Sequence, residues 1–598
     1  MAFDEGFYAN QARWIWETGD WVTPTWWGIP VYDRTIGIQW LIAIAYHLFG
    51  MNEFSARLPS LLACIASVLL TYEIGKILFN PQIAWLGALM LMFMALWIAE
   101  VHLATQTTVL VAIELAGILA VLKLTNRETN SSAWWWGIIA GLSVGMGFII
   151  KGFMIFVPMV ALLPYLIYRQ NYRQLSKNIG VYIGLMIGWI PTLIWLGLSY
   201  RKYGLAPAQD LIKKLLFLSK SDAYDPGPLY YLWNLPANIF PWALFSAIGA
   251  WVVFKKLLPD LNYSVVSLTL GYPISLFILL SLFKTRMPYY AIQLLPFMAL
   301  LAATAFIKFT QIDRQSPPRW YRLMTYLSYA FSGLGLILFI AAIIVINNQQ
   351  LGGIIIPAEV QKYGTSALIL GSGWMSIIIL WRRWQPLSPP YWLAGWLIPA
   401  WFAIASLGLQ GAWTDKSHNF ITSFHQPAIQ REIANQSINL LVDIIEDNKS
   451  QITSDEEQVQ ILETAIETTK GYGLIGTEVK SRSLNSDELK TLILLTFYTP
   501  HLGNKIINFT SLPELSYAWT LNISPQLANR VKVIAKVDEW QLIQKIATNS
   551  LSSSSVRLCV SSVYLRVNYT PTGTANNHHP FTGKDETLST QLPTDVRL

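Results

Sequence analysis

The chain has 598 residues, of which 53% are hydrophobic and only 13% are charged. Soluble proteins carry roughly 25% charged residues, so this composition excludes an ordinary soluble protein. The net charge of +7 does not indicate nucleic acid, because the Lys and Arg residues gather in short loops between apolar segments, as they do on the cytoplasmic side of membrane proteins. Two cysteines, Cys64 and Cys559, are too few for a disulfide framework.

The first residues form an aromatic, amphipathic stretch that begins with Asp4 and Glu5. No basic section leads into an apolar run, so the stretch is neither a signal peptide nor a span. Residues 36–50 are too short to cross a bilayer comfortably, and the aromatic side chains of residues 13–27 suit the headgroup level. We therefore expect both segments to lie in the lipid–water interface.

Twelve apolar segments follow, with lengths close to the roughly 20 residues that cross the hydrocarbon core as a helix. When the sides alternate, all the clusters of Lys and Arg fall on one side, which is then the cytoplasm. The outer side holds residues 1–34, 99–107, 200–237, 284–289 and everything after 411. This orientation predicts a further helix before residue 1. The predicted spans are 55–79, 82–98, 108–124, 134–150, 152–169, 179–199, 238–256, 264–283, 288–309, 326–347, 365–381 and 391–411.

The composition changes after residue 411, where polar residues become frequent. Residues 412–565 predict a small α/β domain. Its expected elements are helices at 429–451 and 538–548 and strands at 490–498 and 530–537. The polar tail 566–598 is predicted to be disordered.

Ionisable side chains on the outer side or at span ends are candidates for chemistry, because charges beside apolar helices are costly and often line a cavity. The cations suit a phosphate, and the acids offer a base. Such a site, far from nucleotide pools, favours a lipid-phosphate substrate reached from the bilayer. The set comprises Asp4, Glu5, Asp33, Arg34, Arg57, Lys151, Lys284 and Arg286, surrounded by Tyr8, Tyr32, Tyr230, Tyr231, Tyr289 and Tyr290.

Each of these residues also has a purely structural explanation. Asp4 and Glu5 can be solvated, and Arg57 can anchor a helix end by extending its charge to the interface. Residues 284–290 can anchor a span in the same way. The functional interpretation is favoured because all of them fall on one side.

Six stretches match a known family in order and spacing: DEGFYANQARWIWETGDWVTP, GIPVYDRTIGIQWL, FGMNEFSARLPSLL, GFIIKGF, GPLYYLWNLPANIFPWALF and KTRMPYYAIQLLPFMALLAA. Together they resemble the aminoarabinose transferase and protein O-mannosyltransferase family, within the GT-C superfamily of membrane glycosyltransferases. The resemblance covers most of residues 1–305.

The resemblance implies a polytopic α-helical membrane protein of GT-C type with about 12 spans, the first of them upstream of residue 1. Residues 1–411 would form the transferase domain and 412–565 an extracytoplasmic α/β domain, in a bacterial inner membrane. The implied reaction is an inverting transfer of a sugar from a polyprenyl-phosphate donor to an acceptor that is a lipid, a glycan or a protein. Such enzymes require no cofactor, and the sequence leaves a divalent metal open.

The resemblance also assigns roles to single residues. Asp4 matches the family's active-site aspartate and Glu5 its neighbour, whereas Asp33 and Arg34 stand where the family usually has Glu and Lys. Donor-phosphate positions are matched by Arg34, Lys151, Lys284 and Arg286, and supporting positions by Asp33, Arg57, Tyr8, Tyr230, Tyr231, Tyr289 and Tyr290.

One departure bears on activity. Thr107 stands where the family typically has a second aspartate, and Glu100 or Glu114 are the acids that could replace it. Two other functions therefore stay open. One is a transporter or flippase for a lipid-linked saccharide, and the other is a non-catalytic lipid-sugar binder, which Thr107 favours.

Overall fold

The computed structural model describes most of the chain. The described residues are 3–125, 133–167, 171–220, 225–257, 263–310, 318–347, 350–351, 354–355, 358–383, 388–411, 420, 424–425, 429–430, 433–434, 436–441, 486–506, 508–521, 523, 527–547, 560–561 and 564–565. The predicted tail, 566–598, lies outside them.

The described residues up to 411 are mostly helical, and many of the helices are apolar. Eight are long and apolar enough to cross a membrane, or up to ten if each sharply bent pair is one span. The chain is therefore a multi-pass α-helical membrane protein. The eight are Glu53–Leu78 (α3), Gln106–Thr125 (α6), Trp134–Ala161, Ile179–Tyr203 (α11), Pro288–Thr310, Arg319–Asn347, Val360–Arg382 and Pro390–Leu409.

Several of these spans are built from more than one element. Trp134–Ala161 contains α7 (Ala133–Lys151), a 3₁₀ turn η2 (Gly152–Ile155) and α8 (Phe156–Ala161), and Pro288–Thr310 contains the 3₁₀ helix η6 (Pro288–Leu294) and α17 (Leu295–Thr310). The last three spans correspond to α18 (Pro318–Asn347), α19 (Ala358–Arg383) and α20 (Ser388–Leu409). The remaining helices before residue 411 are α1 (Phe3–Thr18), α2 (Gly37–Phe49), α4 (Pro81–Leu91), α5 (Ala95–Val101), α9 (Leu163–Ile167), α10 (Asn171–Lys177), α12 (Ala206–Lys220), α13 (Tyr230–Asn238), α14 (Trp242–Leu257), α15 (Tyr263–Val266), the π-helix η5 (Ser267–Gly271) and α16 (Tyr272–Leu282).

The predicted spans differ from the observed helices at four places. The segment 82–98 is bent by 63° between α4 and α5, and 238–256 belongs to a pair, α13 and α14, bent by 109°. Pro241 lies directly before α14 and cannot continue the hydrogen bonding of α13. The segment 264–283 contains only a shorter apolar helix, Ser267–Leu282, and the segments 134–150 and 152–169 contribute to one candidate span.

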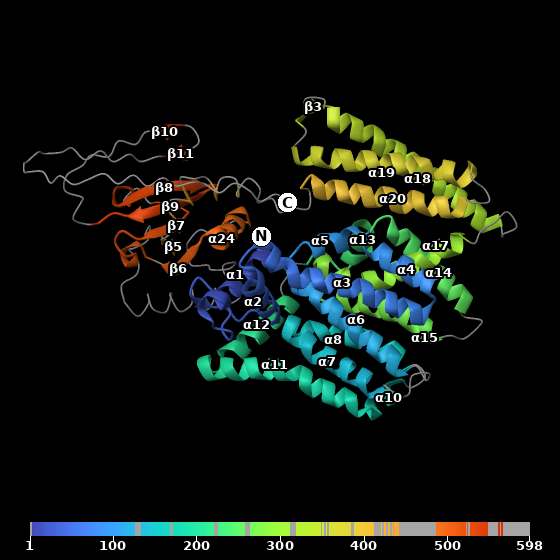
Figure 1. The fold of residues 1–598 in the computed structure, drawn as a ribbon, viewed down its shortest axis with the longest axis horizontal. Coiled ribbons are helices and arrows are strands. Elements are labelled where there is room, and N and C mark those ends of the chain that lie inside the picture. The colour runs from blue at the N-terminus through green and yellow to red at the C-terminus, as the bar shows by residue number, and fades with distance from the viewer. Residues whose placement is uncertain are drawn as a thin grey trace, which may run out of the picture.

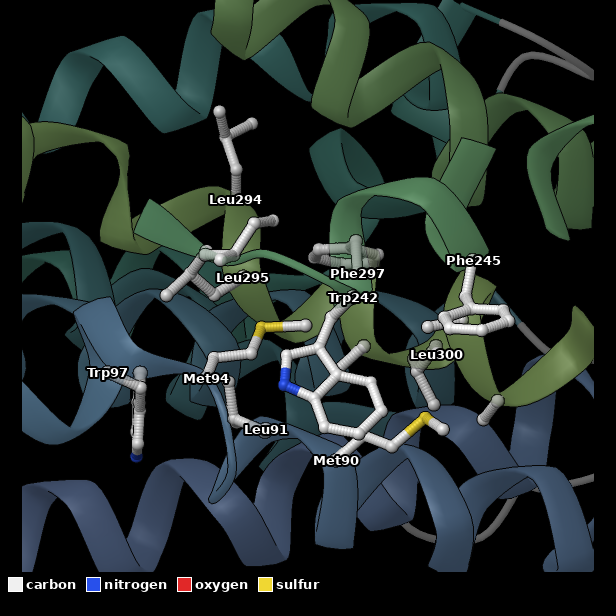
Figure 2. Close-up of a cluster of buried hydrophobic side chains, with 14 of the residues drawn as sticks. Met90, Leu91, Met94, Trp97, Trp242, Phe245, Leu294, Leu295, Phe297 and Leu300 are labelled. Carbon is white, nitrogen blue, oxygen red and sulfur yellow. The ribbon is translucent and has the colours of Figure 1, made fainter. Parts of the chain in front are cut away.

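The bend between α4 and α5 is filled by side chains from distant helices. Trp242 of α14 lies against Met90, Leu91 and Met94, with Leu295 of α17 beside them (Figure 2). The indole Nε1 of Trp242 donates a 2.9 Å hydrogen bond to the carbonyl of Phe93. Because the bend removes that carbonyl from the helix ladder, the indole supplies a partner that lipid does not offer.

The C-terminal part of the chain contains a five-stranded mixed sheet with the order β6-β5-β7-β9-β8. The pairs of β5 with β6 and with β7 are parallel, whereas those of β9 with β7 and with β8 are antiparallel. Helix α24 (Ser486–Tyr498) belongs to the same region, so it is an α/β domain. The strands are β5 (Ser437–Leu441), β6 (His501–Ile506), β7 (Tyr517–Thr520), β8 (Val531–Val537) and β9 (Trp540–Lys545), and two-stranded pairs join β1 (Thr25–Trp26) to β2 (Ile29–Pro30), β3 (Gln350–Leu351) to β4 (Ile354–Ile355) and β10 (Val560–Ser561) to β11 (Tyr564–Leu565).

Only one of the four elements predicted for this domain has the expected type. The strand at 530–537 is confirmed as β8. The predicted strand at 490–498 is wrong, because these residues belong to helix α24. The predicted helix at 538–548 is wrong, because 540–545 form β9 between β7 and β8. The predicted helix at 429–451 is wrong at 437–441, which form β5, and is helical only at the described residues 429, 430 and 433.

The α/β domain packs against the start of the chain, where α24 lies beside α1 (Figure 1). Trp26, Trp27 and Arg13 are at most 4% exposed, and the indole of Trp27 donates to Thr496 Oγ1 of α24 over 3.1 Å. The prediction that residues 13–27 lie in the headgroup region is therefore wrong for these side chains, which the domain covers.

Candidate active site

The first turn of α1 carries Asp4, whose carboxylate meets a cation from the loop before α2. Arg34 Nη2 lies 2.8 Å from Asp4 Oδ1, and Arg34 Nε lies 3.3 Å from Asp33 Oδ2. The guanidinium also stacks over the ring of Tyr8, 5.0 Å from its centroid. Four residues of the predicted set are thus brought together.

The charge of Asp4 is maintained by this cation. Burial raises the pKa of Asp4, but the charge and hydrogen bond of Arg34 outweigh burial and bring the pKa below its usual value of 3.8. Burial lowers the pKa of Arg34, but nearby negative charge, chiefly that of Asp4, outweighs burial and holds the pKa well above its ordinary value. Asp4 is therefore an ionised acceptor at neutral pH.

Arg34 has donor capacity left over. Its Nη1 is buried and has no hydrogen-bond partner among the described residues. A buried N–H without a partner costs about 1–3 kcal/mol, and an anion's oxygen would remove that cost. This is the arrangement expected of a residue that receives a phosphate.

Lys151 supplies a second cation at the end of α7. Its Nζ donates a 2.6 Å hydrogen bond to Thr107 Oγ1 of α6. The rings of Tyr289 and Tyr290, from η6, lie 5.4 and 5.1 Å from the ammonium. No carboxylate of the described chain forms an ion pair with Lys151, although Glu100 and Asp4 act on its charge from farther away.

The two acids proposed to replace the missing aspartate have different surroundings. Glu114 accepts a short hydrogen bond from the hydroxyl of Tyr272, and both residues are buried. Glu100 of α5 is 7% exposed and interacts electrostatically with Lys151 and Asp4. Glu100 is therefore the acid that belongs to the same cluster of charges as Asp4.

Glu5 points away from this cluster and toward α3. Arg57 forms two hydrogen bonds with its carboxylate, 2.6 Å from Nε to Oε1 and 3.2 Å from Nη2 to Oε2. The backbone N–H of Ala104 donates to the same carboxylate over 3.2 Å. The alternative that Arg57 only anchors a helix end is wrong, because it pairs with an acid of α1.

The remaining predicted residues form a neighbouring group around the loop before η6. Arg286 is 6% exposed, pairs with Asp225 and donates to the carbonyl of Ser281 over 2.9 and 3.1 Å. Lys284 is exposed. The role of both residues in phosphate binding stays a prediction.

Two tyrosines of α13 connect this group to the first. The hydroxyl of Tyr231 donates to the carbonyl of Met287 over 3.0 Å, and Tyr230 packs edge to face on Tyr231 with 5.3 Å between ring centroids. Tyr231 also interacts electrostatically with Tyr290, which faces Lys151. Tyr231, Tyr289 and Tyr290 thus connect Met287 to Lys151. Tyr32 lies elsewhere, with its ring 6.2 Å from that of Trp195 and 5.8 Å from that of Tyr203.

Sequence reasoning missed Lys214 on the amphipathic helix α12. Burial lowers its pKa, which is below 10.5 overall, while Asp33 and Asp4 act in the opposite direction. Lys214 is thus a third cation beside Asp4 and Arg34. The sequence feature that could have indicated Lys214 is the pair of adjacent basic residues, Lys213 and Lys214, in a segment predicted to lie on the outer side.

Sequence reasoning also missed Gln293 of η6. It is 1% exposed, and neither its amide oxygen nor its nitrogen has a partner among the described residues. Residues three apart share a face of a 3₁₀ helix, so Gln293 follows Tyr290 on the face toward Lys151.

In the described part of the chain, no group of three or more His, Cys, Asp or Glu is placed to hold a metal ion.

Parts of the chain are similar in sequence to known glycosyltransferases. The family described as dolichyl-phosphate-mannose-protein mannosyltransferase matches residues 33–196. A curated relative from Pseudomonas fluorescens strain Pf-5, an undecaprenyl phosphate-alpha-4-amino-4-deoxy-L-arabinose arabinosyl transferase, is 28% identical over 51% of this chain and 55% of its own length. A Pseudomonas paraeruginosa transferase of the same description is 26% identical over 68% of this chain and 70% of its own length. This chain thus spans about half the length of the former relative.

A solved structure shows the same fold. The crystal structure of ArnT from Cupriavidus metallidurans bound to undecaprenyl phosphate superimposes with a TM-score of 0.64 and 17% identity, covering 92% of this chain and 95% of that one. The resemblance to the aminoarabinose transferase and protein O-mannosyltransferase family is confirmed. The GT-C-type fold includes both the membrane helices and the region of the C-terminal α/β domain.

Proposed function

We propose that the protein is a membrane glycosyltransferase that moves a sugar from a polyprenyl-phosphate donor to an acceptor hydroxyl, with inversion at the anomeric carbon. The observation that carries the proposal is the cluster of Asp4, Arg34 and Lys151. It combines an ionised carboxylate, a guanidinium with an unfilled donor and an ammonium without an ion pair in the described chain. The ligand named for the similar ArnT structure, undecaprenyl phosphate, supports a lipid phosphate as the anion.

The cluster supplies groups for the departing lipid phosphate and for the attacking acceptor hydroxyl. The bond between the anomeric carbon and the phosphate oxygen breaks, and negative charge develops on the lipid phosphate. Arg34 and Lys151 stabilise that charge as it develops. Asp4 accepts the proton of the acceptor hydroxyl as the new bond forms from the opposite face of the sugar.

We place the reaction on the extracytoplasmic face of a bacterial inner membrane. The alternation of positive loops predicted from the sequence supports an outer position for Asp4 and the C-terminal domain. The relatives act, by their names, on 4-amino-4-deoxy-L-arabinose carried by undecaprenyl phosphate, so this donor is the first to test. The acceptor is a lipid, a glycan or a protein of the envelope.

The test is sugar transfer in proteoliposomes. The protein is supplied with radiolabelled polyprenyl-phosphate sugars and cell-envelope acceptors, and the wild type is compared with Asp4→Asn. Loss of a positioned base costs about 100- to 10,000-fold in rate, so labelled product is expected to disappear in the variant. The matched control is Asp20→Asn, which removes an acid of the next loop that pairs with Lys202 over 2.7 Å and lies outside the cluster.

The result also separates the alternatives. Donor binding without transfer by the wild type supports a non-catalytic lipid-sugar binder, the function that Thr107 favours. Movement of intact donor across the vesicle membrane supports a transporter or flippase. Near-normal transfer by Asp4→Asn contradicts the role of Asp4.

A further inference from the structure

The two acids at the start of α1 differ in how they are held. The side chain of Asp4 is 43% exposed, whereas that of Glu5 is 2% exposed. Two nitrogens of Arg57 and the backbone N–H of Ala104 fix the Glu5 carboxylate from different sides. Glu5 therefore has the contacts of an anchor, and Asp4 has the exposure of a group that meets a ligand.

The anchor is connected to the C-terminal domain through a continuous chain of polar contacts. Arg57 Nη1 lies 3.4 Å from Glu53 Oε2 at the start of α3. The other oxygen of Glu53 accepts a short hydrogen bond from the hydroxyl of Tyr498, the last residue of α24. The path from Tyr498 to Glu5 thus needs only Glu53 and Arg57.

A second connection joins the same end of α24 to the middle of α1. Arg13 is 1% exposed and donates to the carbonyls of Thr496 and Thr499, at 3.0 and 2.6 Å, and to those of Phe497 and Pro500. Carbonyls at a helix C-terminus lack partners and carry partial negative charge, so a buried cation is stabilised there. One helix end therefore contacts α1 both directly and through α3.

We propose that the C-terminal end of α24 positions the Asp4–Glu5 turn, with Tyr498 acting through Glu53 and Arg57 on Glu5. Tyr498 and Arg13 are positioning residues, because neither touches the proposed reacting groups. The proposal rests on the proposed function for its effect on rate, but not for its effect on structure. It gives the C-terminal domain a defined part in the donor site, namely holding Asp4 opposite Arg34.

The test is Tyr498→Phe in the full-length protein in proteoliposomes. This change keeps the ring that packs against Phe424 and Phe497 and removes only the hydroxyl. A misplacement of about 1 Å can cost about 100-fold in rate, so we expect a fall of roughly 10-fold in kcat with little change in donor KM. Glu53→Gln and the double variant should show the same fall as Tyr498→Phe alone, because both changes break one path.

Hydrogen–deuterium exchange provides a readout that does not depend on turnover. The backbone amides of residues 5–10 should exchange faster in Tyr498→Phe than in the wild type. Tyr182→Phe is the control, since it also loses one hydroxyl bond, 2.9 Å long and to the carbonyl of Ser176, without touching α1. Unchanged exchange in Tyr498→Phe overturns the proposal, even if the wild type transfers no sugar. Faster exchange with unchanged kcat, in a wild type that does transfer sugar, also overturns it.

Discussion

Lys151 Nζ donates a hydrogen bond to Thr107 Oγ1 over 2.6 Å, and this bond joins the end of α7 to the start of α6. The partner is neutral, so the full charge of the ammonium remains for a ligand. In the family that this chain resembles, an aspartate at the position of Thr107 would meet that charge instead.

Thr107→Asp is expected to weaken the binding of polyprenyl phosphate by roughly 10-fold, because the new carboxylate would pair with Lys151 and compete with the phosphate. Thr107→Ser keeps a hydroxyl and should bind as the wild type does. The measurement is titration of the purified protein with polyprenyl phosphate. A higher transfer rate in Thr107→Asp would show instead that the site lacks a needed acid.

Replacing Arg34 should change the pH dependence of transfer. Arg34 keeps the pKa of Asp4 below 3.8 against the opposing effect of burial, so the acid limb of kcat/KM in the wild type lies below about pH 4. In Arg34→Gln, burial remains and the cation with the largest opposing effect is gone, while Lys151 and Lys214 stay, so the pKa of Asp4 rises and activity is lost at higher pH. Arg34→Lys restores a charge and should keep the limb near its original place. If the acid limb of kcat/KM stays in place in Arg34→Gln, protonation of Asp4 does not control the rate of transfer.

Lys214 is expected to contribute to donor affinity, because it lies beside Asp33, Arg34 and Asp4. Lys214→Met should raise the donor KM several-fold, and the difference from the wild type should shrink at high salt. Lys213→Met removes the same charge from an exposed position of α12 and serves as the control. Equal effects of the two variants would indicate a general surface potential rather than a contact in the site.

Gln293→Met should raise thermal stability and lower the transfer rate. The amide is buried with both polar atoms unpartnered in the described chain, so an apolar side chain of similar size removes an unfavourable burial. The rate should fall if the amide meets the sugar of the donor. Ser366→Ala is the control, because it removes another buried, unpartnered hydroxyl in α19, away from η6. Full activity in Gln293→Met would show that the amide does not contact the sugar of the donor and meets only water.

The sequence was sufficient to predict a multi-pass helical membrane part, because length and hydropathy identify apolar helices, but it did not predict the sharp bends of the pairs α4–α5 and α13–α14. It also selected Asp4, Arg34 and Lys151 by their type and side. It did not show that Glu5 turns away from Asp4, since neighbours on a helix point in different directions. Nor did it show that Arg286 pairs with Asp225, because the two residues are 61 positions apart in sequence.

The C-terminal domain was harder to predict for a physical reason. Residues 490–498 are rich in Thr, Leu, Ile, Phe and Tyr, which favour a strand, yet they form α24 because one face packs on the sheet and another on α1. Residues 540–545 form a strand because β7 and β8 lie on either side of them. Tertiary contacts decide such short segments, and a local pattern does not contain them.

Arg13 and its acceptor in Thr496 are 483 residues apart in sequence. A ribosome adds about 5–20 residues per second, so Arg13 is synthesised roughly 25 to 100 s before the helix end that receives it. During that time the first helix must stay near the membrane surface with a guanidinium that has not met its final acceptors. With α24 positioning the Asp4–Glu5 turn as proposed, Asp4 reaches its final place only after the last quarter of the chain has emerged and folded.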